Sequence, residues 1–150
     1  MINGVPQLED LGDVAGKRVL VRCDFNVPIR DGVITDDLRI RAAPPTPAWL
    51  QERGAPVTAC SPLGRPKGAP DPAFSMDPVR AALAELAPGV ELLENLRFSP
   101  GETGDDPAFV AELVAGQDAY VNDAFGASHR SHASIVGPPR TLPSAAGRLL

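Results

Sequence analysis

Short apolar runs alternate with longer amphipathic stretches along most of the chain. The run at 17–29 is rich in β-branched and apolar residues, which predicts a buried strand that continues into a loop. Similar runs predict strands at 55–60, 90–98 and 118–126. The segment 128–137 is predicted to be a loop that leads into a short fifth strand.

Amphipathic stretches between these strands predict helices. The first is expected to begin near Pro45 and to end at Arg53, because proline is tolerated in a first helical turn. A second helix is predicted over 77–87, with Asp77 as N-cap. A third is predicted after Asp106, with Pro107 as its first residue.

This alternation of strands and helices predicts an α/β protein. We expect a three-layer, Rossmann-like parallel sheet with helices on both faces. At 150 residues the chain is expected to form one domain over 1–150, with 1–15 and 138–150 at its periphery. Sheets of this kind bind ligands in the crevice outside the carboxyl ends of their strands, so we expect the binding residues to lie there.

Composition narrows the classes of partner. The formal net charge of -5 argues against non-specific nucleic-acid binding, although it leaves room for a local basic site. No apolar run approaches 18 residues and no signal peptide opens the chain, so we expect no membrane span and a cytoplasmic protein. Cys23 and Cys60 lack metal-type spacing and are expected to be small core residues.

Polar and cationic residues gather just past the predicted carboxyl ends of the strands. Four separate segments bring arginine to this rim, and all but Lys17 and Lys67 of the 14 cationic residues are arginine. The rim comprises Asp24 and Asn26 after the first strand, Ser61, Arg65 and Lys67 after the second, Asn95 and Arg97 at the end of the third, Asn122, Asp123, His129, Arg130 and His132 after the fourth, and Arg39 and Arg41 from the intervening loop.

Such a rim suits recognition of a small molecule with several negative charges. Guanidinium groups match phosphate and carboxylate oxygens in pairs, and prolines such as Pro66 and Pro28 lower the ordering cost of binding. An alternative remains open from the residues alone. Each arginine could instead cap a helix or pair with one of the 19 acidic residues.

Several long motifs closely resemble the amino-terminal domain of phosphoglycerate kinase. They are "RVLVRCDFNVPI" with "DGVITDDLRIRAA", "LGRPKG", "LLENLRF" with "PGE", "YVNDAFGASHRSHAS" and "LPSAAG". They occur in the family's order and extend from about Gly16 to Gly147.

The resemblance implies transfer of a phosphoryl group between 1,3-bisphosphoglycerate and ADP, with magnesium and without a covalent enzyme intermediate. The amino-terminal lobe would hold 3-phosphoglycerate or 1,3-bisphosphoglycerate, and a carboxyl-terminal lobe would hold Mg-ADP or Mg-ATP. By match to the family motifs, the expected site residues are Asp24 and Asn26 for the glycerate, Arg65, Arg97 and Arg130 for the non-transferred phosphate, and Arg39 as the catalytic residue that stabilises the moving phosphoryl group. His129 is expected to support loop geometry.

The chain departs from the family pattern in several places. No phosphate-binding glycine motif of a nucleotide site is present, so this chain is expected to bind neither cofactor nor metal by itself. One edge strand-helix unit of the family is missing between the helix at 77–87 and the strand at 90–98. Pro62 stands where the family has a substrate-site histidine, and the first helix region has extra prolines.

Two hypotheses from different classes follow. The first is a glycolytic enzyme part: a phosphoglycerate kinase lobe that is inactive alone and acts with a separate nucleotide-binding lobe. The second is a non-catalytic relic or anion-binding pseudoenzyme that keeps the fold and part of the cradle. The arginines favour a retained binding role, whereas Pro62 and the missing unit favour loss of activity.

Overall fold

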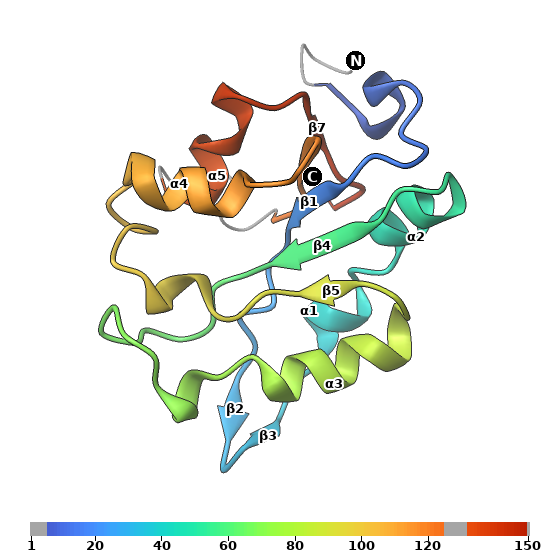
Figure 1. Ribbon diagram of the computed structural model, residues 1–150. Helices are drawn as coiled ribbons and strands as arrows, with labels where there is room; N and C mark the ends of the chain where they lie inside the picture. Colours follow the sequence, from blue (N-terminus) through green and yellow to red (C-terminus); the bar gives the residue numbers. More distant parts are fainter. Residues whose placement is uncertain (1–5, 125–131, 150) are drawn as a thin grey trace.

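A parallel sheet forms the centre of the protein (Figure 1). The computed structural model describes residues 6–124 and 132–149. The sheet has five strands in the order β5-β4-β1-β6-β7, and every neighbouring pair is parallel. The strands are β1 (Val19–Arg22), β4 (Val57–Cys60), β5 (Glu91–Leu92), β6 (Ala119–Asn122) and β7 (Ser144–Ala146).

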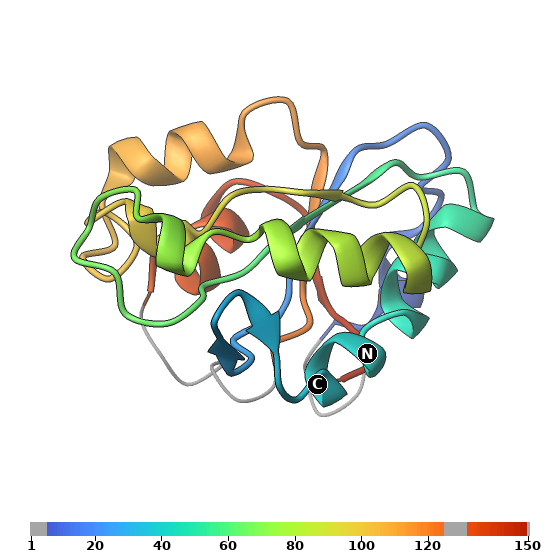
Figure 2. The same cartoon turned by 90° about the horizontal axis from the view of Figure 1, so that it is seen from below.

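Helices cover both faces of this sheet (Figure 2), which confirms the predicted three-layer arrangement. Alternate side chains of a strand point to opposite faces. Val19 and Val21 therefore pack into one apolar cluster, whereas Leu20 packs into another. The first cluster includes residues of α1 (Leu38–Arg41), α2 (Pro45–Glu52) and α3 (Asp77–Leu86), and α4 (Pro107–Val114) and α5 (Ala133–Val136) lie on the second face.

The helix signals were accurate to within a residue or two. α2 begins at Pro45, and Gly54 follows its C-cap with a φ of 81°. α4 begins at Pro107, and the Asp106 side chain accepts a hydrogen bond from the Ala108 amide. α3 begins at Asp77 itself, so Asp77 is its first residue and not the predicted N-cap.

Two strand predictions were wrong. The apolar run at 90–98 forms a strand only over β5, because the chain then turns into a 3-10 helix, η3 (Leu96–Phe98), capped by the Asn95 side chain. The fifth strand does not lie within 128–137, whose described part forms α5. It is β7, in the tail, where Ala145 and Ala146 are buried against β6.

A small antiparallel hairpin lies between β1 and α1. It consists of β2 (Ile29–Arg30) and β3 (Val33–Ile34), joined by Asp31 and Gly32, which both have positive φ. Consecutive positive φ values are typical of a two-residue hairpin turn, and Asp-Gly is a preferred sequence for it. The hairpin returns the chain to α1, and so places Arg39 beside the end of β1.

Among the described residues, the other elements are short 3-10 turns near the ends of the chain and in the loops: η1 (Leu8–Leu11), η2 (Pro72–Phe74) and η5 (Pro138–Arg140). Leu8 and Val14, in the segment expected to be peripheral, are both buried in the first apolar cluster. Both cysteines are free and buried, as predicted. Within the described residues, no helix is long and apolar enough to cross a membrane.

Candidate functional site: a basic cleft at the strand ends

A cleft of about 540 Å³ opens at the carboxyl ends of β1, β4 and β5. We call it the basic cleft, because its walls carry two arginines, a lysine and a histidine. Parallel sheets bind ligands at this edge, so its position agrees with the rule applied to the sequence. Its described lining residues are Asn26, Arg65, Pro66, Lys67, Gly68, Arg97, Ser99, Pro100, Thr103 and His132.

Gly64 connects three walls of the basic cleft. Its amide donates to Oδ1 of Asn26 at 2.9 Å, and its carbonyl accepts from Nη1 of Arg97 at 2.8 Å. Gly64 has a φ of +61°, and a Cβ atom built on it would lie 2.4 Å from a ring carbon of Phe74. Glycine is therefore required by both the backbone conformation and the space available.

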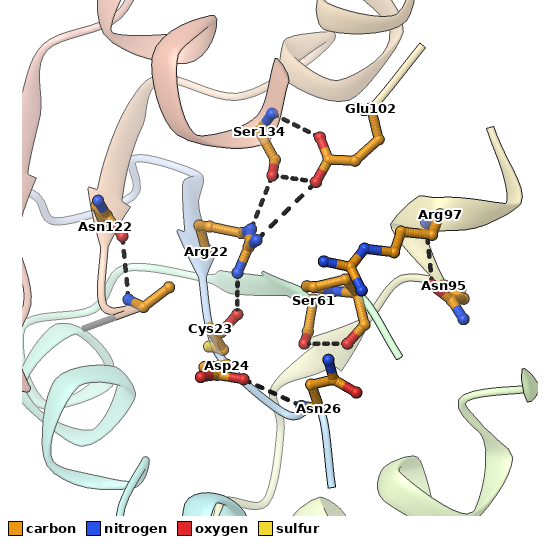
Figure 3. Close-up of polar contacts among 12 residues, drawn as sticks. Arg22, Cys23, Asp24, Asn26, Ser61, Asn95, Arg97, Glu102, Asn122 and Ser134 are labelled. Atoms are coloured by element: carbon orange, nitrogen blue, oxygen red, sulfur yellow. Dashed lines mark hydrogen bonds and ion pairs between the residues drawn. The ribbon is translucent and has the colours of Figure 1, made fainter. Parts of the chain in front are cut away.

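The Asn95 side chain also holds the loop that contains Gly64. It makes four hydrogen bonds although it is almost fully buried. Oδ1 accepts from the amides of Leu63 and Arg97, and Nδ2 donates to the carbonyls of Leu63 and Phe74. Asn95 thus joins the loop that carries Arg65 to the turn that carries Arg97. Its bond to the Arg97 amide is drawn in Figure 3.

Arg39 lies beside the basic cleft, in a second and more apolar hollow of about 500 Å³. The two hollows share Asn26 as a wall. Nη1 of Arg39 is 3.1 Å from both Oδ1 of Asp24 and the carbonyl oxygen of Asn26. The Arg39 side chain remains 55% exposed, so most of its donors stay available to a ligand.

The predicted site residues therefore fall into distinct groups. Asn26, Arg65 and Arg97 line the basic cleft, and Arg39 lines the neighbouring hollow. Asp24 lines neither hollow; it orients Arg39 and accepts from the Asn26 amide at 3.2 Å. Arg130, like His129, lies outside the described residues. The predicted cradle is thus placed in part, and its binding role remains a prediction.

Pro62 is buried and lines neither hollow. Its carbonyl accepts a hydrogen bond from the Ser61 hydroxyl, which in turn accepts from the Phe25 amide. Ser61 thus ties the end of β4 to the segment after β1. In the sequence, residue 62 immediately precedes the loop that carries Gly64 and Arg65.

The expected ligand-binding residues did not include all the residues that line the cleft. Lys67 and His132 belonged to the predicted rim but were given no part in the cradle, and Thr103 was not predicted at all. Sequence reasoning also missed a buried polar cluster of Arg22, Glu102 and Ser134. A charged residue at position 22, inside an otherwise apolar strand, was the signal that could have indicated this cluster, because buried arginine requires partners.

Burial shifts the acidity of several groups near the strand ends. Burial raises the pKa of Cys60 to about 12 and also raises the pKa of Cys23, so both thiols stay protonated near neutral pH. Burial raises the pKa of Asp123 to about 6, despite hydrogen bonds from the Leu149 amide and the Thr46 hydroxyl. The described residues contain no group of three or more histidine, cysteine, aspartate or glutamate side chains that could hold a metal ion.

Comparison with known proteins identifies the family. The family model for phosphoglycerate kinase matches residues 8–91 and 87–150 of the chain. The chain belongs to the phosphoglycerate kinase family. Phosphoglycerate kinase of Rubrobacter xylanophilus is 53% identical over 161 residues, and that of Salinispora arenicola is 50% identical over 175 residues. The structure of phosphoglycerate kinase from Coxiella burnetii superposes with a TM-score of 0.89 at 32% identity.

These comparisons cover nearly all of this chain but only part of its relatives. The alignments include 92% and 95% of the chain, but 41% and 44% of the Rubrobacter and Salinispora proteins. The Coxiella structure is matched over 97% of this chain and 42% of its own. The family model matches in two pieces that overlap at 87–91, within the stretch where the sequence was expected to lack a strand-helix unit of the family. β5, which follows this point, is an edge strand.

Proposed function

We propose that this chain forms the phosphoglycerate-binding lobe of a phosphoglycerate kinase. In this proposal the basic cleft binds 3-phosphoglycerate or 1,3-bisphosphoglycerate, and phosphoryl transfer to or from ADP or ATP requires a nucleotide-binding lobe. The observation that carries the proposal is the convergence of Arg65, Lys67 and Arg97 on one cleft in a protein of net charge -5. Cations brought together in this way repel one another unless an anion joins them.

The geometry of the basic cleft suits a phosphate group. Arg97 is oriented by its hydrogen bond to the Gly64 carbonyl, which lowers the ordering cost when an anion binds. The hydroxyls of Ser99 and Thr103 and the side-chain Nδ2 of Asn26 offer hydrogen bonds to the remaining oxygens of the ligand. Arg130, outside the described residues, completes the cradle in this proposal.

Arg39 is proposed to act on the phosphoryl group that moves. Phosphoryl transfer depends mainly on positioning and on stabilising the charge that develops on the transferred group. Arg39 lies across Asn26 from the phosphate-binding cations and is held by the Asp24 carboxylate. A phosphoglycerate that extends from the basic cleft past Asn26 would therefore present its reactive end to this guanidinium.

Mg-ADP or Mg-ATP is proposed to bind to the other lobe and not to this chain. The sequence contains no phosphate-binding glycine motif of a nucleotide site. Positioning by domain closure would then bring nucleotide and phosphoglycerate together, and this lobe alone would not turn over substrate. Cytoplasmic glycolysis is the expected setting.

Calorimetric titration of the folded chain with 3-phosphoglycerate tests the proposal. Weak binding is expected, and neither ADP nor ATP should produce heat. Arg65→Ala should weaken phosphoglycerate binding about 10- to 100-fold, since a charge-assisted hydrogen bond contributes roughly 1.5–3 kcal/mol. The matched control is Arg18→Ala, because Arg18 is exposed and precedes β1 at the opposite end of the sheet. Absence of heat with a protein shown to be folded by circular dichroism would refute the binding claim.

A non-catalytic, anion-binding relic is the second candidate. Pro62 and the missing strand-helix unit favour it, because Pro62 replaces a histidine of the family just before the loop that carries Arg65, and the missing unit would remove part of the family's sheet. The two candidate functions are distinguished by mixing the chain with a separately produced nucleotide-binding lobe of a relative and assaying phosphoryl transfer. Restored phosphoryl transfer supports the enzyme lobe, whereas phosphoglycerate binding without any transfer supports the relic.

A further inference from the structure

A fully buried polar cluster joins the end of β1 to α5 (Figure 3). We call Arg22, Glu102 and Ser134 the buried triad. Nε of Arg22 donates to Oγ of Ser134 at 2.7 Å, and this hydroxyl donates to Oε2 of Glu102 at 2.5 Å. Nη2 of Arg22 lies 4.0 Å from Oε2 of Glu102, and the two side chains are 1% and 0% exposed.

Stability alone is a poor explanation for this arrangement. Removing two charges from water costs more than their mutual attraction returns unless the geometry is excellent. Here the closest approach of the charged groups is 4.0 Å, and Nη2 of Arg22 has no hydrogen-bond acceptor among the described residues. Apolar side chains of similar volume fill such positions at equal or lower cost.

The placement of the triad suggests a positioning role. Arg22 is the last residue of β1, and its Nη1 donates to the Cys23 carbonyl at 2.5 Å, directly before Asp24. The triad therefore fixes the backbone that leads to Asn26, on one side of the basic cleft.

Glu102 fixes the opposite side. Its carbonyl accepts from the Ala133 amide at 2.7 Å, and its Oε1 accepts from the Ser134 amide at 2.8 Å. The residues next to these bonds, Thr103 and His132, both line the basic cleft. A further tie comes from β6, where the Tyr120 hydroxyl donates to the Ser134 carbonyl at 2.6 Å.

We propose that Arg22, Glu102 and Ser134 are positioning residues that set the distance between the Asn26 wall and the His132 wall of the basic cleft, and through it the affinity for the phosphorylated ligand. This inference rests on the proposed function. None of the three residues lines the cleft, so they act through the residues that do. Small errors in such a supporting shell are enough to loosen a site whose ligand-contacting residues are intact.

Two variants test the proposal. Ser134→Ala removes the hydroxyl that joins Arg22 to Glu102, but keeps the backbone hydrogen bond to Glu102. The double variant Arg22→Met with Glu102→Leu replaces both charges by apolar side chains, and so avoids a buried unpaired charge. Ser144→Ala is the matched control, because its partly buried hydroxyl, on β7, donates to the Leu142 carbonyl and, among the described residues, has no hydrogen bond to the buried triad.

Three measurements are made on each variant. Urea unfolding reports stability, calorimetry reports the dissociation constant for 3-phosphoglycerate, and carbon-proton NMR reports the histidine rings without ligand. The chain has only two histidines, so the His132 ring signal is readily assigned. We expect the double variant to unfold near the urea midpoint of the wild type, and Ser134→Ala to unfold at a lower urea concentration because it leaves two buried charged groups with one hydrogen bond fewer each. Both variants should remain folded without urea, bind about 10-fold more weakly or worse, and shift the His132 signal. Ser144→Ala should leave all three unchanged.

The results separate this inference from the proposed function. If the wild-type chain does not bind 3-phosphoglycerate, the function fails, and the His132 signal alone then decides the positioning claim. Wild-type affinity together with an unshifted His132 signal in a folded triad variant would overturn the inference. Should the double variant fail to fold, Ser134→Ala decides the positioning claim by the same criteria.

Discussion

Asn95 is the side chain whose replacement tests most directly how the cation-bearing loop is held. The Asn95→Asp variant keeps the shape of the side chain and Oδ1, which accepts from the Leu63 and Arg97 amides at 3.1 and 3.0 Å. It replaces Nδ2 by an oxygen, which would then face the Leu63 and Phe74 carbonyls at 2.7 and 3.0 Å. Two hydrogen bonds are lost and two repulsive contacts are introduced.

The magnitude follows from these contacts and from burial. Each lost hydrogen bond contributes roughly 0.5–1.5 kcal/mol, and leaving a buried polar group unsatisfied costs about 1–3 kcal/mol. Asn95 is 4% exposed, so water cannot replace the missing donors. We expect the free energy of unfolding to fall by about 3–5 kcal/mol at neutral pH, a large share of the roughly 5–15 kcal/mol of a typical domain.

Protonation of the new carboxyl provides an internal check. A protonated aspartic acid donates one hydrogen bond and so recovers one of the two lost interactions. Burial and the facing carbonyls disfavour the charged form, and therefore raise its pKa in the folded state. A raised native pKa adds stability that is present at low pH and lost as pH rises through that pKa. The deficit of Asn95→Asp should thus shrink on acidification.

Urea unfolding followed by far-ultraviolet circular dichroism and by Trp49 fluorescence measures these changes. The matched control is Gln51→Glu, which makes the same amide-to-acid change at a half-exposed side chain with one hydrogen bond, to the Pro88 carbonyl. The control should stay within about 0.5 kcal/mol of the wild type. If Asn95→Asp at neutral pH unfolds at the same urea concentration as Gln51→Glu, Asn95 does not hold the loop as described.

Further predictions concern three other positions. Burial raises the pKa of Asp123 from 3.8 to about 6, so its carboxyl should add on the order of 3 kcal/mol of stability below pH 4 that is lost as pH rises through 6. Asp123→Asn should flatten this pH dependence of the free energy of unfolding in urea titrations. A profile of the variant that runs parallel to that of the wild type would contradict the prediction. Pro62 lines neither hollow, but the longer side chain of Pro62→His brings an N–H donor and should tighten 3-phosphoglycerate binding by about 10- to 100-fold through a charge-assisted hydrogen bond. An unchanged dissociation constant by calorimetry would show that a side chain at position 62 does not reach the ligand. Gly64→Ala should destabilise the fold by about 1–3 kcal/mol in the same unfolding assay and weaken binding, because φ is +61° and Phe74 must move; wild-type behaviour would show that this turn relaxes freely.

Local signals predicted much of this architecture correctly. Proline at the start of α2 and α4, together with Asp106, marked helix boundaries because these residues act within one turn of the chain. The Asp31-Gly32 hairpin had an equally local signal, which a reading of the segment as a polar loop overlooked.

Errors arose where a neighbouring segment decided the outcome. The apolar run after Leu92 leaves the sheet because Asn95 bonds to the loop after β4, a partner more than 30 residues away in sequence. The fifth strand was expected within 128–137, where α5 forms, and β7 lies instead in the tail that was expected to be peripheral. Small residues such as Ala145 and Ala146 form a strand there because β6 offers a pairing edge.

The sequence by itself determined the class of fold, the edge of the sheet at which cations gather, and the family. Periodicity, caps and motif order are properties of short segments, so they survive without knowledge of distant contacts. Only the tertiary structure decided that Asn26 lies between two hollows, that Lys67 and His132 line the basic cleft, and that the Asp24 carboxylate orients the Arg39 guanidinium. It also decided that Arg22 meets Glu102 and Ser134, because residues 80 and 112 positions apart are brought together only when β1 and α5 pack against one another.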